Sequence, residues 1–343
     1  MTTRSRWLAG LLSMHLGVLG FGCITDESDD DPAPRVDAGS PDAGGPDSKV
    51  DGGTGGKTDG GSKGTVEQTV TPYVTGAGIG VSDLSASTKF YTEALGLTFK
   101  YNLDTEVWNE NVLADVRGNS VVIMDFVKER NTQDNPAKLV FAVKSVTDAV
   151  QKVIAAGGKT FSPPTTFAGS TVALMLDPDG YLVELIEAPT APSAVLVGVG
   201  VGVSDLDASQ DYYTRVLGLR FSRDIDVPGF MDEKELKSPL NKGPSVILMH
   251  YEKARSYENV PVKIVLAVSD ATKFTSVVAA EDPAKLIAPA APYGNTGYKI
   301  GMAADLEGTL IEVLESTVPR DAGIPDAGAR DGGTARVGLD AGR

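Results

Sequence analysis

Apolar and polar positions along residues 71–316 change period in a fixed order that predicts alternating strands and helices. A short apolar run ending at Val81 is followed by Ser82 and Asp83, which are favoured helix N-caps. Apolar side chains spaced seven and then four residues apart predict a helix next, and Gly96 suits a left-handed helix end. Strand-like runs follow at 98–101, 113–117 and 120–126. This order predicts one βαβββ module.

The same order returns immediately and predicts a second module. A strand at 139–143 leads to a helix with an apolar stripe, which a Gly-Gly pair at 157–158 ends. The sequence Asp-Pro-Asp-Gly at 177–180 is a strong turn signal between the last two strands. The strands predicted after this helix lie near 159–161, 171–176 and 182–187.

The pair of modules is duplicated along the chain. Residues 78–99 and 200–221 are identical at 14 of 22 positions, and the strand that begins at Lys138 corresponds to the one that begins at Lys263. The chain therefore contains two copies of a unit of about 120 residues, or four βαβββ modules. The two domains predicted from the repeat span 67–189 and 190–317.

The residues before the repeats predict export from a bacterial cell. Arg4 and Arg6 precede an apolar stretch at 7–22, which is too short and glycine-rich to span a membrane and is typical of a signal peptide. The segment ending in Cys23 resembles the lipobox of bacterial lipoproteins, although its leucine lies four residues before the cysteine rather than three. We predict a signal peptide at 1–23 with a lipidated Cys23, and hence a membrane-anchored lipoprotein of the cell envelope. Ordinary secretion with a free cysteine is the alternative.

Composition separates the repeats from two flanking segments. Residues 24–66 and 318–343 are rich in Asp, Gly and Pro and cannot bury apolar area, so we predict disordered tethers. The net charge of −15 argues against nucleic acid as a partner and leaves the lipid anchor as the only membrane contact. A single cysteine excludes an internal disulfide. Because both copies lie in one chain, we expect a monomer.

Two sequence motifs resemble those of a known superfamily. The opening motif at 81–97 and the closing motif at 177–186 are similar to the vicinal oxygen chelate superfamily, which includes glyoxalase I, extradiol dioxygenases and bleomycin-resistance proteins. The resemblance covers 71–188 and 194–316. It implies an α+β fold of tandem glyoxalase-like domains, each made of two paired βαβββ modules that form a cupped mixed sheet. A site inside each cup is implied as well.

The resemblance also identifies positions that would bind a divalent metal in enzymes of the superfamily. There the ligands are histidine or glutamine and glutamate on the first and last strands of the paired modules. The first-strand positions here are Gly76 and Gly198, which have no ligating side chain. The last strand of the first module offers Met124 or Asp125, and in the second repeat Met249 or His250; a shift of one residue reverses the face, so both registers stay open.

The remaining ligand-equivalent positions hold Lys138 and Lys263 on first strands, and Glu184 and Glu312 on last strands. A protonated lysine cannot ligate a metal. The chain has two histidines, one of them in the signal peptide, so a two-histidine, one-carboxylate site is impossible within one mature chain. We therefore predict no metal and no cofactor, with ligand-equivalent residues retained only at Glu184 and Glu312. The resemblance implies that each lysine faces the glutamate of its module where the metal would be; lysines pointing to solvent are the alternative.

Three functions remain open, and whether the protein is an enzyme is left uncertain. The first is a metal-free protein that binds a small organic molecule in one or both cups. The second is a divergent glyoxalase-type lyase or dioxygenase-like enzyme, in which a divalent metal would be held by Asp125, Glu184, His250 and Glu312. The third is an envelope scaffold with filled cups. The candidate ligand-pocket residues are Lys138, Glu184, Asp125, Lys263, His250 and Glu312.

Overall fold

The computed structural model describes most of the two predicted domains. The described residues are 66–128, 130, 137–167, 169–227, 229–293 and 298–316. The predicted signal peptide, Cys23 and the two acidic tails lie outside the described residues, apart from Val66. No helix within the described part of the chain is long and apolar enough to cross a bilayer.

The described residues form four βαβββ modules in chain order. Module 1 comprises β1 (Tyr73–Gly80), α2 (Leu84–Leu95), β2 (Thr98–Asp104), β3 (Trp108–Ala114) and β4 (Ser120–Phe126). Module 2 comprises β5 (Ala137–Val143), α3 (Val146–Ala155), β6 (Lys159–Phe167), β7 (Ser170–Leu176) and β8 (Leu182–Glu187). Module 3 comprises β9 (Val195–Gly202), α4 (Leu206–Asp211), the π-helical turn η1 (Tyr212–Val216), β10 (Arg220–Val227), β11 (Met231–Lys237) and β12 (Ser245–Tyr251). Module 4 comprises β13 (Val262–Val268), α5 (Ala271–Glu281), β14 (Leu286–Pro292), β15 (Lys299–Ala304) and β16 (Leu310–Glu315).

The helix ends follow the local sequence signals. Asp83 accepts hydrogen bonds from the backbone N–H groups of Ser85 and Ala86 and so caps the start of α2. Gly96 ends the helix at a φ of 71°, in the left-handed region that favours glycine. Both features match the prediction for this module.

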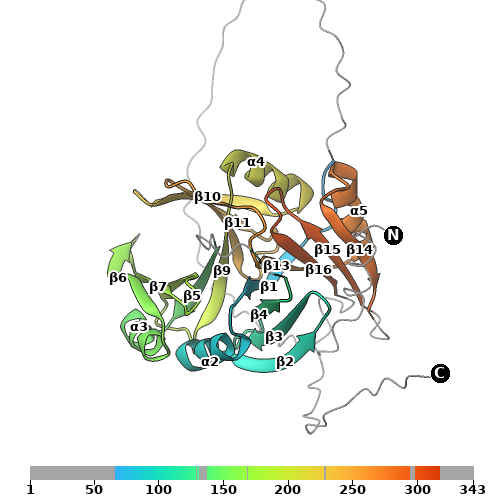
Figure 1. The fold of residues 1–343 in the computed structure, drawn as a ribbon. Coiled ribbons are helices and arrows are strands. Elements are labelled where there is room, and N and C mark those ends of the chain that lie inside the picture. The colour runs from blue at the N-terminus through green and yellow to red at the C-terminus, as the bar shows by residue number, and fades with distance from the viewer. Residues whose placement is uncertain are drawn as a thin grey trace, which may run out of the picture. The chain divides into compact units, whose positions relative to one another are not determined.

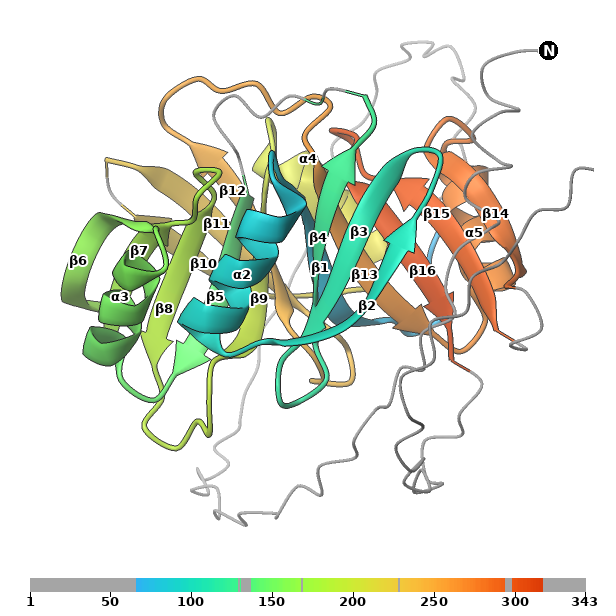
Figure 2. The same cartoon turned by 60° about the horizontal axis from the view of Figure 1, so that its bottom comes forward.

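The strands form two mixed eight-stranded sheets, each shared by two modules (Figures 1 and 2). Sheet A has the order β14-β15-β16-β13-β1-β4-β3-β2, and sheet B has the order β10-β11-β12-β9-β5-β8-β7-β6. The modules are joined at the centre by antiparallel pairs, β1 with β13 and β5 with β9. The α+β fold of βαβββ modules in cupped mixed sheets is thus confirmed.

The modules pair across the repeats, not within them. Modules 1 and 4 form sheet A, and modules 2 and 3 form sheet B, whereas the resemblance implied that the two modules of one repeat share a sheet. The physical reason is that β1 and β9 are copies of one strand and present the same edge. Either could pair with β5 or β13, so the repeat alone does not select a partner.

Helices, in contrast, pack within each repeat. Helix α2 contacts α3 in the first repeat, and η1 contacts α5 in the second. Their buried side chains join one continuous core with the sheet faces that they cover. Each repeat is therefore held together by helix packing, and the two repeats are held together by strand pairing.

The two motifs that carry the family resemblance contact each other in the first repeat. The Tyr91 hydroxyl donates to Asp177 at 2.8 Å, and the backbone N–H of Ser82 donates to Asp179 at 2.8 Å. The hydroxyl of Tyr181 donates to the carbonyl of Gly80 at 2.7 Å. The 177–180 turn of module 2 is thus fixed to the start of α2 in module 1, which explains why Tyr91 is a core residue.

Candidate functional site

Each sheet has two chemically different faces. Residues such as Leu139 and Phe141 on β5 point outward into the helix-covered core, while Lys138 and Val140 alternate with them and point to the other side. We call this other side the inner face. The inner face of sheet A carries an apolar cluster that includes Trp108, Val112, Val122, Met124, Ala288, Met302 and Leu310. The inner face of sheet B carries Val140, Met231, Ile247, Met249, Tyr251 and Tyr257.

A buried lysine lies between two glutamates at the centre of sheet B. The ammonium of Lys138 on β5 is 2.6 Å from a carboxylate oxygen of Glu184 on β8 and 2.6 Å from one of Glu233 on β11. The lysine and Glu233 side chains are only 2% and 3% exposed, whereas Glu184 is 18% exposed. We call these three residues triad B.

The same arrangement recurs at the centre of sheet A. The ammonium of Lys263 on β13 is 2.7 Å from Glu312 on β16 and 2.9 Å from Glu110 on β3. All three side chains are at most 3% exposed. We call them triad A. In both triads the glutamates come from both modules of the sheet, so the ion pairs also join the paired modules.

The carboxylates keep both lysines charged. Burial alone would lower the pKa of Lys138, but Glu184 and Glu233 outweigh burial and the net effect raises it. Lys263 follows the same pattern, with burial opposed by Glu110 and Glu312. A lysine with a raised pKa stays an ammonium at neutral pH. It is therefore a fixed cation and not a nucleophile or a base.

Glycines make room for the lysine stems. A Cβ added to Gly200 on β9 would lie 2.8 Å from the Cβ of Lys138 and 2.7 Å from the sulfur of Met249. At Gly78 on β1, an added Cβ would lie 3.0 Å from the Cβ of Lys263. The central strand of each sheet therefore needs glycine next to the lysine because any larger residue meets its side chain.

The sheet registers place the sequence-predicted residues. Met124 belongs to the inner-face cluster of sheet A and Met249 to that of sheet B. Asp125 and His250 each follow one of these methionines in the strand, so their side chains point to the outer face, away from the triads. The ring of His250 contacts the carbonyl of Val203 through Nδ1 at 3.0 Å. The structure thus brings Lys138 to Glu184 and Lys263 to Glu312, and leaves Asp125 and His250 apart from them.

Two triad members were missed by sequence reasoning. Glu110 and Glu233 lie on the strand before the last one of their modules, whereas only first and last strands had been considered. The lysines pair with Gly78 and Gly200, two residues beyond the first-strand glycines inferred from the resemblance. An acidic residue recurs at this position in both repeats, but the recurrence alone does not show that the strand brings it to the centre of the sheet.

The two triads differ in what covers them. In sheet A the indole of Trp108 donates to Glu110 at 2.7 Å, and its ring centroid lies 5.5 Å from the Lys263 ammonium. The register places Met231 at the position of Trp108 in sheet B, and a methionine has no N–H to donate to Glu233. The indole of Trp108 therefore covers triad A, and triad B has no counterpart to this indole.

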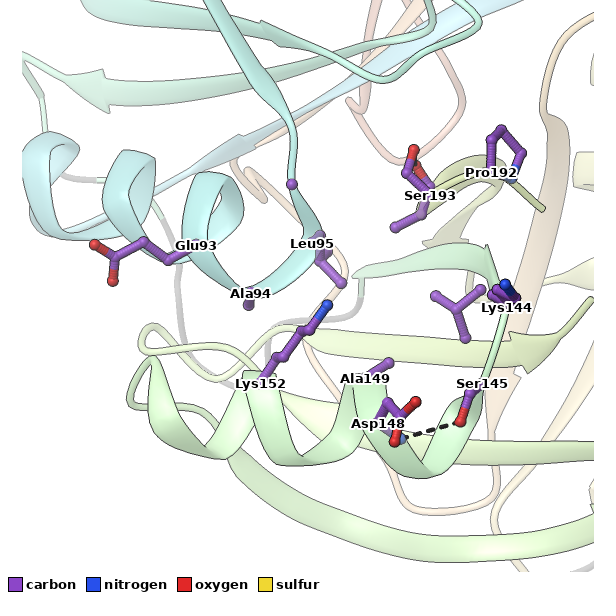
Figure 3. Close-up of a pocket in the computed structure, with 13 residues that line it drawn as sticks. Glu93, Ala94, Leu95, Lys144, Ser145, Asp148, Ala149, Lys152, Pro192 and Ser193 are labelled. Carbon is purple, nitrogen blue, oxygen red and sulfur yellow. Dashed lines mark hydrogen bonds between the residues drawn. The ribbon is translucent and has the colours of Figure 1, made fainter. Parts of the chain in front are cut away.

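A separate cavity of about 480 Å³ lies outside both inner faces. It is formed by the end of α2, the start of α3 and the segment that joins the repeats (Figure 3). Its rim mixes acidic and basic side chains, Glu93 and Asp148 with Lys144 and Lys152, and no candidate residue from the sequence lines it. The described lining therefore offers no concentrated charge and no reactive group.

The order of the βαβββ modules and their pairing in two mixed sheets define a glyoxalase-type fold. The family model for the Glyoxalase/Bleomycin resistance protein/Dioxygenase superfamily matches residues 72–185 and 195–313. The chain belongs to this family.

Two curated relatives that match the chain carry the name lactoylglutathione lyase. The chain is 27% identical to lactoylglutathione lyase GLX1 of Arabidopsis thaliana over 248 residues, covering 66% of this chain and 86% of the relative. It is 28% identical to a putative lactoylglutathione lyase of Brassica oleracea over 251 residues, with the same coverage of both chains. Among solved structures, glyoxalase I from Zea mays aligns with a TM-score of 0.61 at 22% identity, covering 72% of this chain and 93% of that one. At this identity the structural likeness shows the fold.

The donor set does not fit the divalent metal of the family. A divalent cation at the triad centre would stand where the lysine ammonium stands, and the ammonium repels it and has no lone pair to share. Gly78 and Gly200, beside the lysines, contribute no ligating side chain either. Within the described residues no group of three or more His, Cys, Asp or Glu side chains could hold a metal ion.

Proposed function

We propose that this chain is a metal-independent member of the glyoxalase family that binds a small organic molecule on the inner face of its sheets. The observation that carries the proposal is the lysine ammonium held between two carboxylates in both sheets. Each ammonium fills the place of the metal with a permanent cation and removes the Lewis acid on which the family's enzymes depend. Inner-face residues remain available for recognition, and the fold presents them on rigid strands.

Metal analysis of the purified protein tests the first half of this proposal. The full chain should hold no stoichiometric divalent metal after dialysis against metal-free buffer. The variant Lys138→His turns triad B into one imidazole and two carboxylates, and should gain zinc or nickel. Stoichiometric metal in the unaltered protein would refute the proposal. A histidine variant that gains none would show that something other than the lysine excludes the metal.

Ligand binding is tested by a ligand-observed NMR screen of small organic molecules. Leu174 lies beside Glu184 on the inner face of sheet B, so Leu174→Trp should block this face while leaving the outer-face core intact. Binding that this variant removes supports the proposal. If no member of a chemically broad screen binds, the scaffold function is the better description.

A second candidate is a lyase, because the curated relatives carry the name lactoylglutathione lyase. It predicts measurable production of lactoylglutathione by the purified chain, with or without added divalent metal. We expect none, since both lysines stay protonated and lie where a divalent metal would have to bind between the two glutamates. Activity that disappears in Glu184→Gln or Glu312→Gln would favour the lyase over the binding protein.

We further propose that the chain is exported and anchored through Cys23, on the sequence features of residues 1–23. Expression in a bacterium followed by fractionation tests this. The unaltered chain should appear with membranes and carry lipid on Cys23 by mass spectrometry. Cys23→Ser should be released in soluble form.

A further inference from the structure

The two inner faces differ in exposure, although they descend from the same unit. Glu184 is 18% exposed, whereas its counterpart Glu312 is 3% exposed. Leu174, the cross-strand neighbour of Glu184, is half-buried, while Met302 beside Glu312 is buried. Sheet B therefore presents its triad to solvent at Glu184, and sheet A does not.

Two substitutions between the repeats account for this difference. Trp108 belongs to the apolar cluster over triad A, and Tyr101 packs against that cluster. The equivalent positions in sheet B hold Met231 and Arg223. The arginine is 62% exposed and is held by Glu235 at 2.8 Å, so it does not cover triad B.

Aromatic rings line the same face of sheet B near its two edges. Phe161 on the edge strand β6 and Phe230, which precedes β11, lie with ring centroids 5.1 Å apart. Phe230 in turn packs edge-on against Tyr251 at 5.5 Å. Strands β6 and β10 are the two edges of sheet B (Figure 1). Phe161 is 48% exposed, so this aromatic row is open to solvent at one end.

Charge at the open triad favours a positively charged ligand. Two carboxylates face one ammonium, so triad B carries a net negative charge while Glu184 still reaches solvent. Aromatic faces attract cations as well, and Arg255 already stacks on Tyr251 with its guanidinium 3.8 Å from the ring centroid. The exposed ring of Phe161 leaves a second aromatic surface available.

We propose that the inner face of sheet B is a site for small organic cations with an apolar or aromatic body, whose ammonium group binds Glu184. This inference rests on the ligand-binding function proposed above and assigns it to one sheet and one class of ligand. Sheet A, with its enclosed triad, has a structural role.

Three probes of matched shape separate charge from shape. Phenethylammonium, 2-phenylethanol and 3-phenylpropionate share one aromatic body and differ in the end group. Titrated into the full chain by calorimetry and NMR, the ammonium should bind about ten- to a hundredfold more tightly than the alcohol, the size of one hydrogen bond between charged groups. The carboxylate should bind more weakly still.

Matched variants locate the site. Glu184→Gln should remove the preference for the ammonium, and Glu312→Gln, its counterpart in sheet A, should leave the preference unchanged. Thermal unfolding of both variants checks that each is folded. The indole N–H resonance of Trp108, which reports on sheet A, should not move on binding.

Three other results would contradict the cation site on sheet B, each in a different part. If the alcohol or the carboxylate binds as tightly and Leu174→Trp removes that binding, the site exists but the class of ligand is wrong. If Glu312→Gln and not Glu184→Gln abolishes the preference, the assignment to sheet B is wrong. If none of the three probes binds at millimolar concentration, the inference fails; the broader NMR screen then decides separately whether the proposed function fails with it.

Discussion

At the scale of single residues, the lysine of each triad neutralises carboxylates that cannot be solvated. Glu110 and Glu312 are almost completely buried and meet the same ammonium. A buried ion pair adds little net stability compared with an apolar replacement, but removing one partner leaves an uncompensated charge. Lys263 is therefore needed to balance the buried charges of Glu110 and Glu312.

We predict that Lys263→Met lowers the free energy of unfolding by about 3–5 kcal/mol at pH 8. The triple variant Glu110→Gln, Lys263→Met, Glu312→Gln should regain most of the loss because no buried charge remains. Urea unfolding of the unaltered protein, the single variant and the triple variant measures these free energies. Equal losses in the single and triple variants would contradict the argument.

The glycines beside the lysines give a graded prediction. Gly200→Ala should cost about 1–3 kcal/mol of stability, since its Cβ meets the first carbon of the Lys138 side chain, which cannot move without the strand. Gly78→Ala should cost less because its added Cβ lies 3.0 Å from the Cβ of Lys263, compared with 2.8 Å from the Cβ of Lys138 at Gly200. Denaturant midpoints of the two variants provide the comparison, and the opposite order would show that the contacts relax freely.

The sequence could predict two of the three members of each triad. Lys138 and Glu184 lie on strands whose positions the repeat and the family resemblance fix. Glu110 and Glu233 could not be identified as triad members from sequence. Alternation along a strand tells which residues share a face of the sheet, but it does not tell which strand brings its residue to the centre of that sheet. The register at Met124 and Met249 depended on a shift of one residue, which only the paired strands determine.

At the scale of elements, the turn at 177–180 connects the modules of the first repeat through a buried carboxylate. Asp177 accepts from Tyr91 and from the backbone of Asp179 and Tyr181. Burial raises its pKa to about 7 despite these hydrogen bonds, which lower it. Asp305 occupies the same place in the second repeat, accepts from Tyr213, and also has a pKa raised by burial.

This turn predicts a dependence of stability on pH. An acid whose pKa is higher in the folded state than its ordinary 3.8 binds protons more tightly when folded. Its contribution therefore decreases as the pH rises from about 4 to 7 and is constant above that. Asp177→Asn should remove a change in unfolding free energy of about 4 kcal/mol over this interval. Asp177→Asn with Asp305→Asn should give the flattest profile.

Unfolding free energies measured from pH 4 to pH 8 test the prediction. Asp83→Asn is a suitable control, because Asp83 is an exposed N-cap whose hydrogen bonds asparagine can also accept. An unchanged slope in Asp177→Asn would show that another group controls the titration.

The elements themselves were largely predictable, since caps, apolar periods and turn residues are local signals. The helices at 84–95 and 146–155 and most strands lie where the pattern placed them. The second copy departs from the first at Tyr212–Val216, which forms a π-helical turn and is identical to residues 90–94 at two of five positions.

At the scale of the whole molecule, pairing across the repeats makes neither repeat self-sufficient. Repeat 1 alone would keep its helix packing but would leave β1 and β5 without their antiparallel partners. Unpaired edges of this kind associate with other chains. The sequence could not reveal that the strands pair across the repeats, because strand pairing within one repeat would use the same strands and the same residues.

We therefore predict that residues 66–193 and 194–317, produced as separate chains, do not form folded monomers. Each should self-associate, with β1 of one copy pairing with β5 of another, or in the second half β9 with β13. An equimolar mixture should give a heterodimer that unfolds near the temperature of the intact protein. Light scattering and calorimetry decide the matter, and a folded monomeric half would falsify the prediction.

The order of the modules is nested, with the inner two forming one sheet and the outer two forming the other. During synthesis from the N-terminus, the partner of the first module is therefore the last to be made. Sheet B can close once β9–β12 have emerged, while β1 waits until β13 is complete. A premature stop anywhere in the final module thus leaves the oldest part of the chain exposed, and incomplete copies are open to proteolysis from their beginning.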